Sequence, residues 1–211
     1  IYLEDGDIAS LNIDKLEIYD KSFQQVKRLV HESKLDLESM ELGPYDHFMQ
    51  KEIYEQPRAL AGSREAVVDN NAFGVGLLGK KEKKILLNVD SVLILAAGTS
   101  YYAGLTAKYW MESIAKIPIN VEIASEYRYR TSVPNKNQLI VTISQSGETL
   151  DTIESLKHAK NIGHEKTLSI CNVQDSAIVR ESKLVLYTRA GIKIDLTSTK
   201  AFKTQVEHIF I

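Results

Sequence analysis

From Ser91 onward, short apolar runs rich in β-branched residues alternate with longer segments of helical periodicity, and no other feature constrains the fold as much. We expect strands at Val92–Ala97, Ile119–Ile123, Leu139–Ile143, Thr167–Cys171 and Leu184–Thr188. We expect helices at Ser100–Ala115, Thr149–Ile162, Ser176–Glu181 and Ser198–Ile211. This alternation predicts an α/β fold of three layers, in which a mainly parallel sheet is covered by helices on both faces.

The first 90 residues are less regular. Residues 1–20 predict the strands of a different unit, and residues 21–40 form a charged amphipathic stretch that predicts a helical connector. We expect a linker over residues 21–45 and a new domain from Asp46, a candidate helix cap. Pro57 should bend the following helix or make it restart. Both ends of the sequence stop within a secondary-structure pattern, so we expect a piece of a longer chain.

Composition narrows the classes of function. The net charge of −2 gives no electrostatic reason to expect nucleic acid or a membrane surface as a partner. No apolar stretch approaches the roughly 20 residues that a membrane helix requires. Cys171 is the only cysteine, so no disulfide can form within the chain, which is typical of the cytoplasm. We expect Cys171 to be a buried strand residue.

Several well-known cofactor motifs are absent from the sequence. Gly98 to Gly104 does not fit the dinucleotide pattern G-x-G-x-x-G, and there is no G-x-x-x-x-G-K-[ST] phosphate loop. No H-E-x-x-H motif or paired Cys/His cluster indicates a metal site. We therefore expect neither a nucleotide cofactor nor a metal.

Small hydroxyl side chains gather where three of the predicted strands end. They belong to Gly98-Thr-Ser100 after the first strand, Ser144-Gln-Ser-Gly-Glu-Thr149 after the third and Thr197-Ser-Thr199 after the last. Ligands of open α/β sheets bind beyond the carboxyl ends of the strands. Capping of the next helix by Ser146 or Thr149 would account for one of these hydroxyls, but not for all of them.

A helix N-terminus presents free N–H groups and the positive end of the helix dipole, so hydroxyls gathered there predict a phosphate site that needs no arginine. Gly147 would let the backbone approach the ligand closely. Glu148 would repel a bound anion, so its side chain should point away or hold something else. Lys200 lies in the first turn of its predicted helix, where a cation is disfavoured. We expect it to be solvated, with an anionic neighbour as the alternative.

The residues resemble the glutamine–fructose-6-phosphate aminotransferase family, also called the glucosamine-6-phosphate synthases, over nearly the whole chain. The resemblance rests on Leu42–Met49, Glu52–Pro57, Gly98–Tyr101, Tyr109–Glu112, Val121–Glu126, Ser144–Thr149, Ile170–Asn172, Val179–Ser182 and Ser198–Phe202. The Ser-Gln-Ser-Gly-Glu-Thr loop alone is typical of sugar-isomerase (SIS) domains in general. The chain departs from the family's usual pattern at Lys193 and Asp195.

The resemblance implies a flavodoxin-like SIS domain. Residues 1–20 would be the end of the family's glutaminase half, and residues 46–211 would be its first SIS domain, cut short at the C-terminus. The implied ligands are fructose 6-phosphate and glucosamine 6-phosphate. The residues implied to surround the phosphate are Ser100, Ser144, Gln145, Ser146 and Thr149, with Thr99 and Ser198 near the sugar.

The family converts fructose 6-phosphate and glutamine to glucosamine 6-phosphate and glutamate, the first step of hexosamine and UDP-GlcNAc synthesis, without a metal or redox cofactor. Its catalytic residues would lie outside residues 1–211, so we expect no catalytic residue here and no activity from this chain alone. By analogy we expect a homodimer. Two alternatives remain: another SIS enzyme, such as a deglycase or ketose–aldose isomerase, or a non-catalytic sugar-phosphate-binding module of the kind found in transcriptional regulators.

Overall fold

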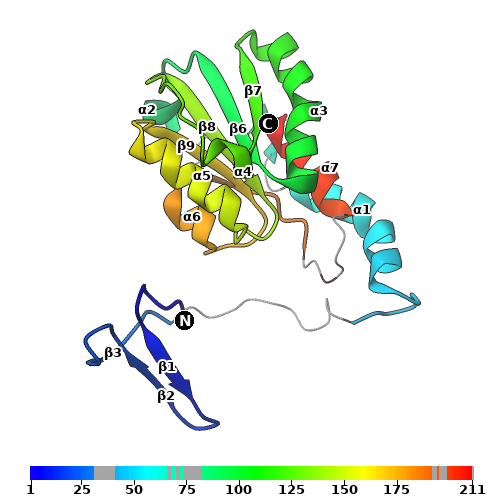
Figure 1. Cartoon of the computed structure of the whole chain (residues 1–211). Helices are drawn as coiled ribbons and strands as arrows, with labels where there is room; N and C mark the ends of the chain where they lie inside the picture. The colour runs from blue at the N-terminus through cyan, green and yellow to red at the C-terminus, as the bar shows by residue number, and fades with distance from the viewer. Residues whose placement is uncertain are drawn as a thin grey trace. The chain divides into compact units, whose positions relative to one another are not determined.

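The computed structural model describes residues 1–30, 41–65, 68–69, 72–73, 82–191, 194 and 199–210. The chain divides into two compact units, Ile1–Glu41 and Leu42–Ile211, coloured from blue to red along the sequence in Figure 1. No helix among these described residues is long and apolar enough to cross a membrane.

The first unit contains a small antiparallel sheet in the order β1-β2-β3. Its strands are β1 (Ile8–Leu11), β2 (Leu16–Tyr19) and β3 (Gln25–Val26). Asp20 ends β2, and its Oδ1 accepts hydrogen bonds from the backbone N–H groups of Ser22 and Gln24 at 2.8 and 3.0 Å. The predicted helix over residues 21–40 is therefore wrong at Gln25–Val26, because this Asp-centred turn returns the chain to the sheet.

The second unit is built on a parallel sheet with the strand order β10-β9-β8-β6-β7. Its strands are β6 (Ser91–Ala96), β7 (Ile119–Ile123), β8 (Gln138–Ser144), β9 (Lys166–Cys171) and β10 (Leu184–Tyr187). The five strands predicted from the sequence are confirmed, each within one residue at either end. The order is that of flavodoxin-like sheets, in which the chain winds outward from two central strands.

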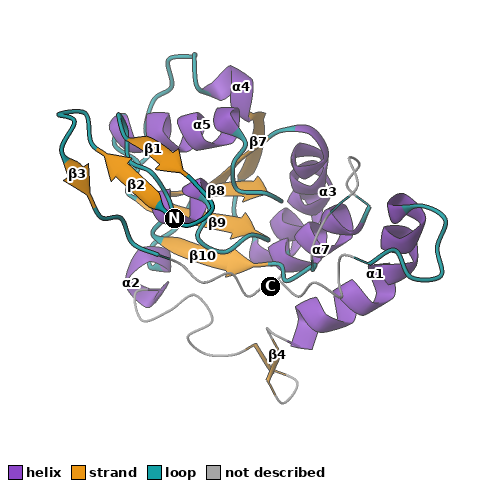
Figure 2. Ribbon diagram, turned by 90° about the horizontal axis from the view of Figure 1, so that it is seen from below, coloured by secondary structure: helices purple, strands orange, loops and turns teal. Residues whose placement is uncertain are grey.

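Helices cover both faces of this sheet, as Figures 1 and 2 show. They are α1 (Phe48–Glu65), α2 (Glu82–Leu86), α3 (Gly98–Ala115), α4 (Ala124–Tyr127), α5 (Leu150–Asn161), α6 (Ala177–Glu181) and α7 (Lys200–Ile209). Two short strands, β4 (Val68–Asp69) and β5 (Ala72–Phe73), pair with each other. Neither α2 nor α4 was among the helices predicted from the sequence.

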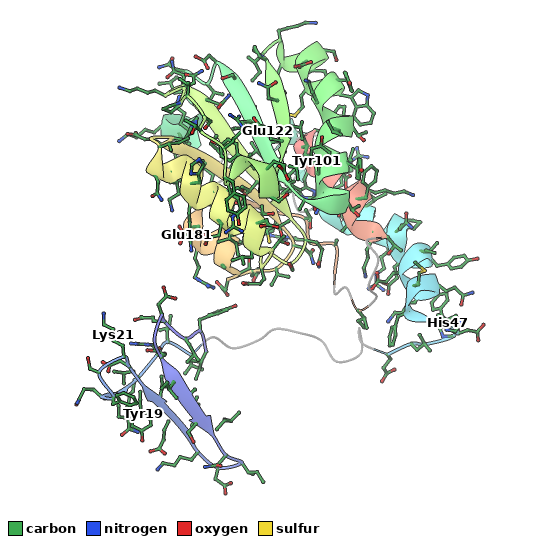
Figure 3. The ribbon with its side chains drawn as sticks, viewed as in Figure 1. Tyr19, Lys21, His47, Tyr101, Glu122 and Glu181 are labelled. Atoms are coloured by element: carbon green, nitrogen blue, oxygen red, sulfur yellow. The ribbon has the colours of Figure 1, made fainter. Side chains whose placement is uncertain are left out.

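Alternate side chains of the strands enter two separate cores. Ile94 points to the side of α3 and α7, and Leu95 points to the side of α4, α5 and α6. Both side chains are fully buried. On the second side, α5 and α6 are also joined by an ion pair between Lys160 and Glu181, the latter labelled in Figure 3. The three-layer α/β/α fold expected from the alternating pattern is therefore confirmed.

Helix α3 packs closely on the sheet at Gly104. A Cβ atom at this position would lie 3.0 Å from Cγ2 of Ile94 and 3.2 Å from Cγ1 of Val121. A larger residue would push the helix away from the strands, so glycine here fixes the distance between α3 and the sheet.

Pro57 does not make α1 restart, because the helix is continuous from Phe48 to Glu65. Residues on both sides of the proline contact the C-terminal part of the chain: Glu52 accepts a hydrogen bond from Thr199, and Ser63 lies beside His208. Tertiary packing along the whole helix thus outweighs the hydrogen bond that proline removes.

Candidate functional site

The candidate site lies between the carboxyl ends of β6 and β8, the two central strands at which the winding of the sheet reverses. The connection after β6 leads to α3 on one face, and the connection after β8 leads to α5 on the other. A crevice at such a switch point is where doubly wound sheets bind ligands. A pocket of about 190 Å³ opens here, lined by Ala97, Thr99, Ser100, Ile143, Ser144, Gln145, Ser146, Thr149 and Thr152.

Six of the seven ligand residues expected from the sequence lie together in the lining of this pocket. They are Thr99, Ser100, Ser144, Gln145, Ser146 and Thr149. The seventh, Ser198, lies outside the described residues, as do Lys193 and Asp195. The lining contains no ionisable side chain among the described residues, so the pocket offers hydrogen bonds but no acid or base.

Two helices begin at the pocket without a side-chain cap. Ala97 is the N-cap of α3 and Thr149 is the N-cap of α5, and neither helix has a side-chain cap hydrogen bond. The suggested capping role of Thr149 is therefore wrong for its hydroxyl. Each helix carries about half a positive charge at its N-terminus, and both ends line the same pocket. Together they provide a positive potential without any basic side chain.

The loop after β8 is held in place by its own hydrogen bonds. Oγ of Ser144 accepts a hydrogen bond of 3.0 Å from the backbone N–H of Gly147 and lies 3.4 Å from Oγ1 of Thr149. Oγ of Ser146 accepts one of 3.2 Å from the N–H of Glu148, which is a bond within the loop rather than a cap of α5. The hydroxyls are therefore fixed before any ligand arrives.

Gly147 is required by the loop for two reasons. Its φ of +70° lies in the left-handed region, and a Cβ atom would come within 2.0 Å of Oγ of Ser176 and 2.8 Å of Sγ of Cys171. The close approach of this backbone lets the Gly147 carbonyl accept a hydrogen bond of 3.0 Å from the N–H of Ile178 in α6. Glycine at this position thus packs the loop against α6.

Glu148 does not point at the pocket. Its Oε1 accepts a hydrogen bond of 2.8 Å from the backbone N–H of Ala177, the first residue of α6. The carboxylate is therefore directed away from the place where an anion would bind, as the sequence analysis required.

Thr152 belongs to the pocket lining and was missed from the sequence. Its side chain is only 1% exposed, and its Oγ1 is buried without a hydrogen-bond partner. A buried hydroxyl without a partner costs about 1–3 kcal/mol, which is unusual for a residue in the first turn of a helix. In the sequence, only the position of Thr152 one turn after the Ser144–Thr149 loop could have indicated that it lines the pocket.

The expectation that Lys200 is solvated is wrong. Its side chain is buried, and its Nζ lies 2.8 Å from Oε2 of Glu55 on α1. The alternative, an anionic neighbour, is therefore the observed arrangement. This partner also offsets the unfavourable position of a cation in the first turn of α7.

Cys171 is a buried strand residue, as expected. Burial raises the pKa of its thiol, and a hydrogen bond with Ser176 opposes this only in part. A thiol with a raised pKa is a poor nucleophile at neutral pH, so Cys171 acts in packing behind the loop rather than in chemistry.

Comparison with known proteins bears on this geometry. The family model described as "SIS domain" matches residues 85–209, which include every lining residue of the pocket. This chain belongs to the SIS-domain family. The SIS fold also agrees with a solved structure, the C-terminal domain of glucosamine-fructose-6-phosphate aminotransferase from Francisella tularensis. That structure has a TM-score of 0.77 and 46% identity, over 79% of this chain and 47% of its own length.

Curated relatives match this chain over 99–100% of its length, including the residues before 85 that the family model does not match. Glutamine–fructose-6-phosphate aminotransferase of Xanthomonas campestris is 58% identical over 210 residues, which are 100% of this chain. The enzyme of the same name from Neisseria meningitidis serogroup A is 60% identical over 99% of this chain. The chain spans 34% of the length of each of these relatives. The resemblance to the glutamine–fructose-6-phosphate aminotransferases is thus confirmed.

Proposed function

We propose that this chain is the part of a glutamine–fructose-6-phosphate aminotransferase that binds the phosphate group of fructose 6-phosphate. The observation that carries the proposal is the meeting, in one pocket, of two helix N-termini without side-chain caps and seven side chains with hydroxyl or amide groups. The identity of 58–60% to enzymes of that name over the whole chain supports the choice of substrate.

Binding would depend on uncharged donors. Ser100, Ser144, Gln145, Ser146 and Thr149 donate to the phosphate oxygens, and each hydrogen bond to a charged group contributes about 1.5–3 kcal/mol. Each helix terminus adds about 0.3–1 kcal/mol, and up to about 2 kcal/mol where it is partly buried. Thr99 and Ser198 lie nearer the sugar in this proposal. No side chain of the described lining carries a charge, so the positive potential that attracts the dianion comes from the two helix N-termini.

The chain on its own would bind this sugar phosphate weakly and convert none of it. The pocket lining offers no general acid or base among the described residues, so ring opening and proton transfer need groups from elsewhere in the enzyme. The intact enzyme would form glucosamine 6-phosphate and glutamate, the first step of hexosamine synthesis, as a cytoplasmic homodimer. Residues 1–20 would end its glutaminase half, residues 21–45 would be a linker, and residues 46–211 would be its first SIS domain.

Calorimetric titration tests the proposal. Fructose 6-phosphate should bind to the chain and fructose, which lacks the phosphate, should not. The double variant Ser144→Ala/Thr149→Val should lose most of the affinity, whereas Ser113→Ala, a change of an exposed hydroxyl on α3, should keep it. Equal binding of fructose, or a double variant that binds as tightly as the wild type, would contradict the proposal.

A further inference from the structure

The loop after β8 also caps the N-terminus of α6. Ser176, the N-cap residue of this helix, makes no side-chain cap hydrogen bond. The first N–H group of α6, that of Ala177, instead donates to Oε1 of Glu148 at 2.8 Å. The second, that of Ile178, donates to the carbonyl of Gly147 at 3.0 Å. Since the first N–H groups of a helix have no partner within it, these two bonds fasten α6 to the loop.

A third contact joins the loop to the segment after β9. The backbone N–H of Asn172 donates to the carbonyl of Gln145 at 3.3 Å. Since β8 lies between β9 and β6 in the sheet, this carbonyl is directed to the β9 side. The C=O and N–H of a trans peptide point in opposite directions, so the N–H of Ser146 is directed to the β6 side, where the pocket opens. Contacts on the side of β9 and α6 therefore orient the donors that face the pocket.

Of these three contacts, that of Glu148 is the one made by a side chain of the loop. Glu148 immediately precedes Thr149, the N-cap of α5, so the position of its carboxylate constrains the backbone that enters this helix. Its negative charge has the opposite consequence, because a carboxylate near the pocket repels a bound dianion. A carboxylate at this position therefore favours binding only if its hydrogen bond to α6 contributes more than the repulsion removes.

We propose that Glu148 is a positioning residue, whose hydrogen bond to α6 holds the loop after β8 in the shape that binds phosphate. This rests on the proposed function. The bond acts on the part of the pocket that would contact the phosphate group and not the sugar. Every ligand that carries a phosphate should therefore depend on this bond to the same degree.

Two substitutions of Glu148 separate its hydrogen bond from its charge. Glu148→Gln keeps an oxygen acceptor for the N–H of Ala177 and removes the negative charge, whereas Glu148→Ala removes both. Glu181→Ala is the matched control. Glu181 also joins α6 to α5, through an ion pair with Lys160 at the opposite end of α6, and its substitution removes one negative charge as well. The affinities for inorganic phosphate and for fructose 6-phosphate are measured by calorimetry for the wild type and all three variants.

We expect Glu148→Gln to bind both ligands at least as tightly as the wild type. Glu148→Ala should bind both ligands about fivefold more weakly than Glu148→Gln, which corresponds to the loss of one hydrogen bond. Glu181→Ala should bind both as the wild type does. Equal affinities of the Gln and Ala variants, an equal loss in Glu181→Ala, or a loss confined to fructose 6-phosphate would overturn the positioning role.

Hydrogen exchange at the Ile178 amide separates a failure of this role from a failure of the proposed function. If the wild type binds neither ligand, the proposed function fails. The bond from Ile178 to the Gly147 carbonyl does not use the side chain of Glu148, so its exchange rate reports whether the loop stays docked on α6. Faster exchange at Ile178 in Glu148→Ala than in Glu148→Gln would support the positioning of the loop by Glu148, and equal exchange would overturn it.

Discussion

Oγ of Ser144 accepts a hydrogen bond of 3.0 Å from the backbone N–H of Gly147, and the same hydroxyl lines the pocket between α3 and α5. One side chain therefore shapes the loop and faces the pocket. Since the hydroxyl accepts from Gly147, its own proton is left to donate to a phosphate oxygen. Because Ser144 has these two roles, its substitution should affect ligand binding differently from substitution of its neighbour Thr149.

Ser144→Ala should weaken binding of fructose 6-phosphate more than Thr149→Val. The alanine variant loses a ligand donor and leaves the N–H of Gly147 without its acceptor, whereas the valine variant loses only a donor. We expect each change to cost about 1.5–3 kcal/mol of binding free energy, with Ser144→Ala at the upper end. Calorimetry measures this, and equal effects of the two changes would argue against the double role of Ser144.

Gly147→Ala should destabilise the chain strongly. The new Cβ would collide with Ser176, and the φ of +70° would become strained. Gly163→Ala is the matched control, because Gly163 also has a positive φ, of +110°, but has open space where a Cβ would lie. We expect the control to cost about 1 kcal/mol of unfolding free energy and Gly147→Ala to cost at least about 2 kcal/mol more. Urea unfolding measures both free energies. Similar costs for the two variants would contradict this prediction, because they would show that the Ser176 side chain moves aside at little cost.

Glu55→Gln should destabilise the chain by leaving the buried ammonium of Lys200 without its carboxylate. Loss of one partner of a fully buried pair costs about 3–5 kcal/mol, and we expect about 2–3 kcal/mol because Glu55 is partly exposed. The double variant Glu55→Gln/Lys200→Met should recover much of this loss, since no buried charge then remains. A double variant less stable than Glu55→Gln would contradict this explanation, with thermal unfolding as the measurement.

His208 should make the stability of the second unit depend on pH. Burial lowers the pKa of His208, hydrogen bonds to backbone carbonyls oppose the shift, and the nearby Arg189 adds to it. A folded-state pKa below that of the unfolded state means that the unfolded chain binds the proton more readily. The stabilising effect is thus present above the unfolded pKa of about 6.5 and is lost as the pH falls below it.

Urea unfolding at pH 7.5 and at pH 5.5 checks this dependence. His208→Asn should show a smaller loss of unfolding free energy between the two pH values than the wild type. His164, whose pKa is also lowered by burial, remains in both proteins and provides the background slope. An unchanged slope in His208→Asn would assign the pH dependence to other groups.

Local sequence patterns predicted the sheet because each strand is a short apolar run. Such a run can be recognised without knowing which distant residues it contacts. Ile94 and Leu95, for example, are both fully buried although they are neighbours, which only a strand covered on both sides allows. The hydroxyl loop was predictable for a similar reason. It follows a strand and precedes a helix, so Ser144–Thr149 had to lie at the edge where parallel sheets bind ligands.

The contacts between distant segments were not predictable in this way. The ion pair of Lys200 could not be predicted, because its partner Glu55 is 145 residues away in the sequence. A restart of the helix at Pro57 was one of the two expectations, and the packing of α1 on α7 that keeps the helix continuous involves Ser63 and His208, also 145 residues apart. The strand at Gln25–Val26 was missed because the turn at Asp20 outweighed the amphipathic pattern.

A crystal structure of the chain with fructose 6-phosphate tests the central claim most directly. We predict electron density for the phosphate between the N-termini of α3 and α5, within about 2.5–3.2 Å of the donors on Ser100, Ser144 and Thr149. Density for the ligand at another place, with this pocket filled only by solvent, would contradict the account.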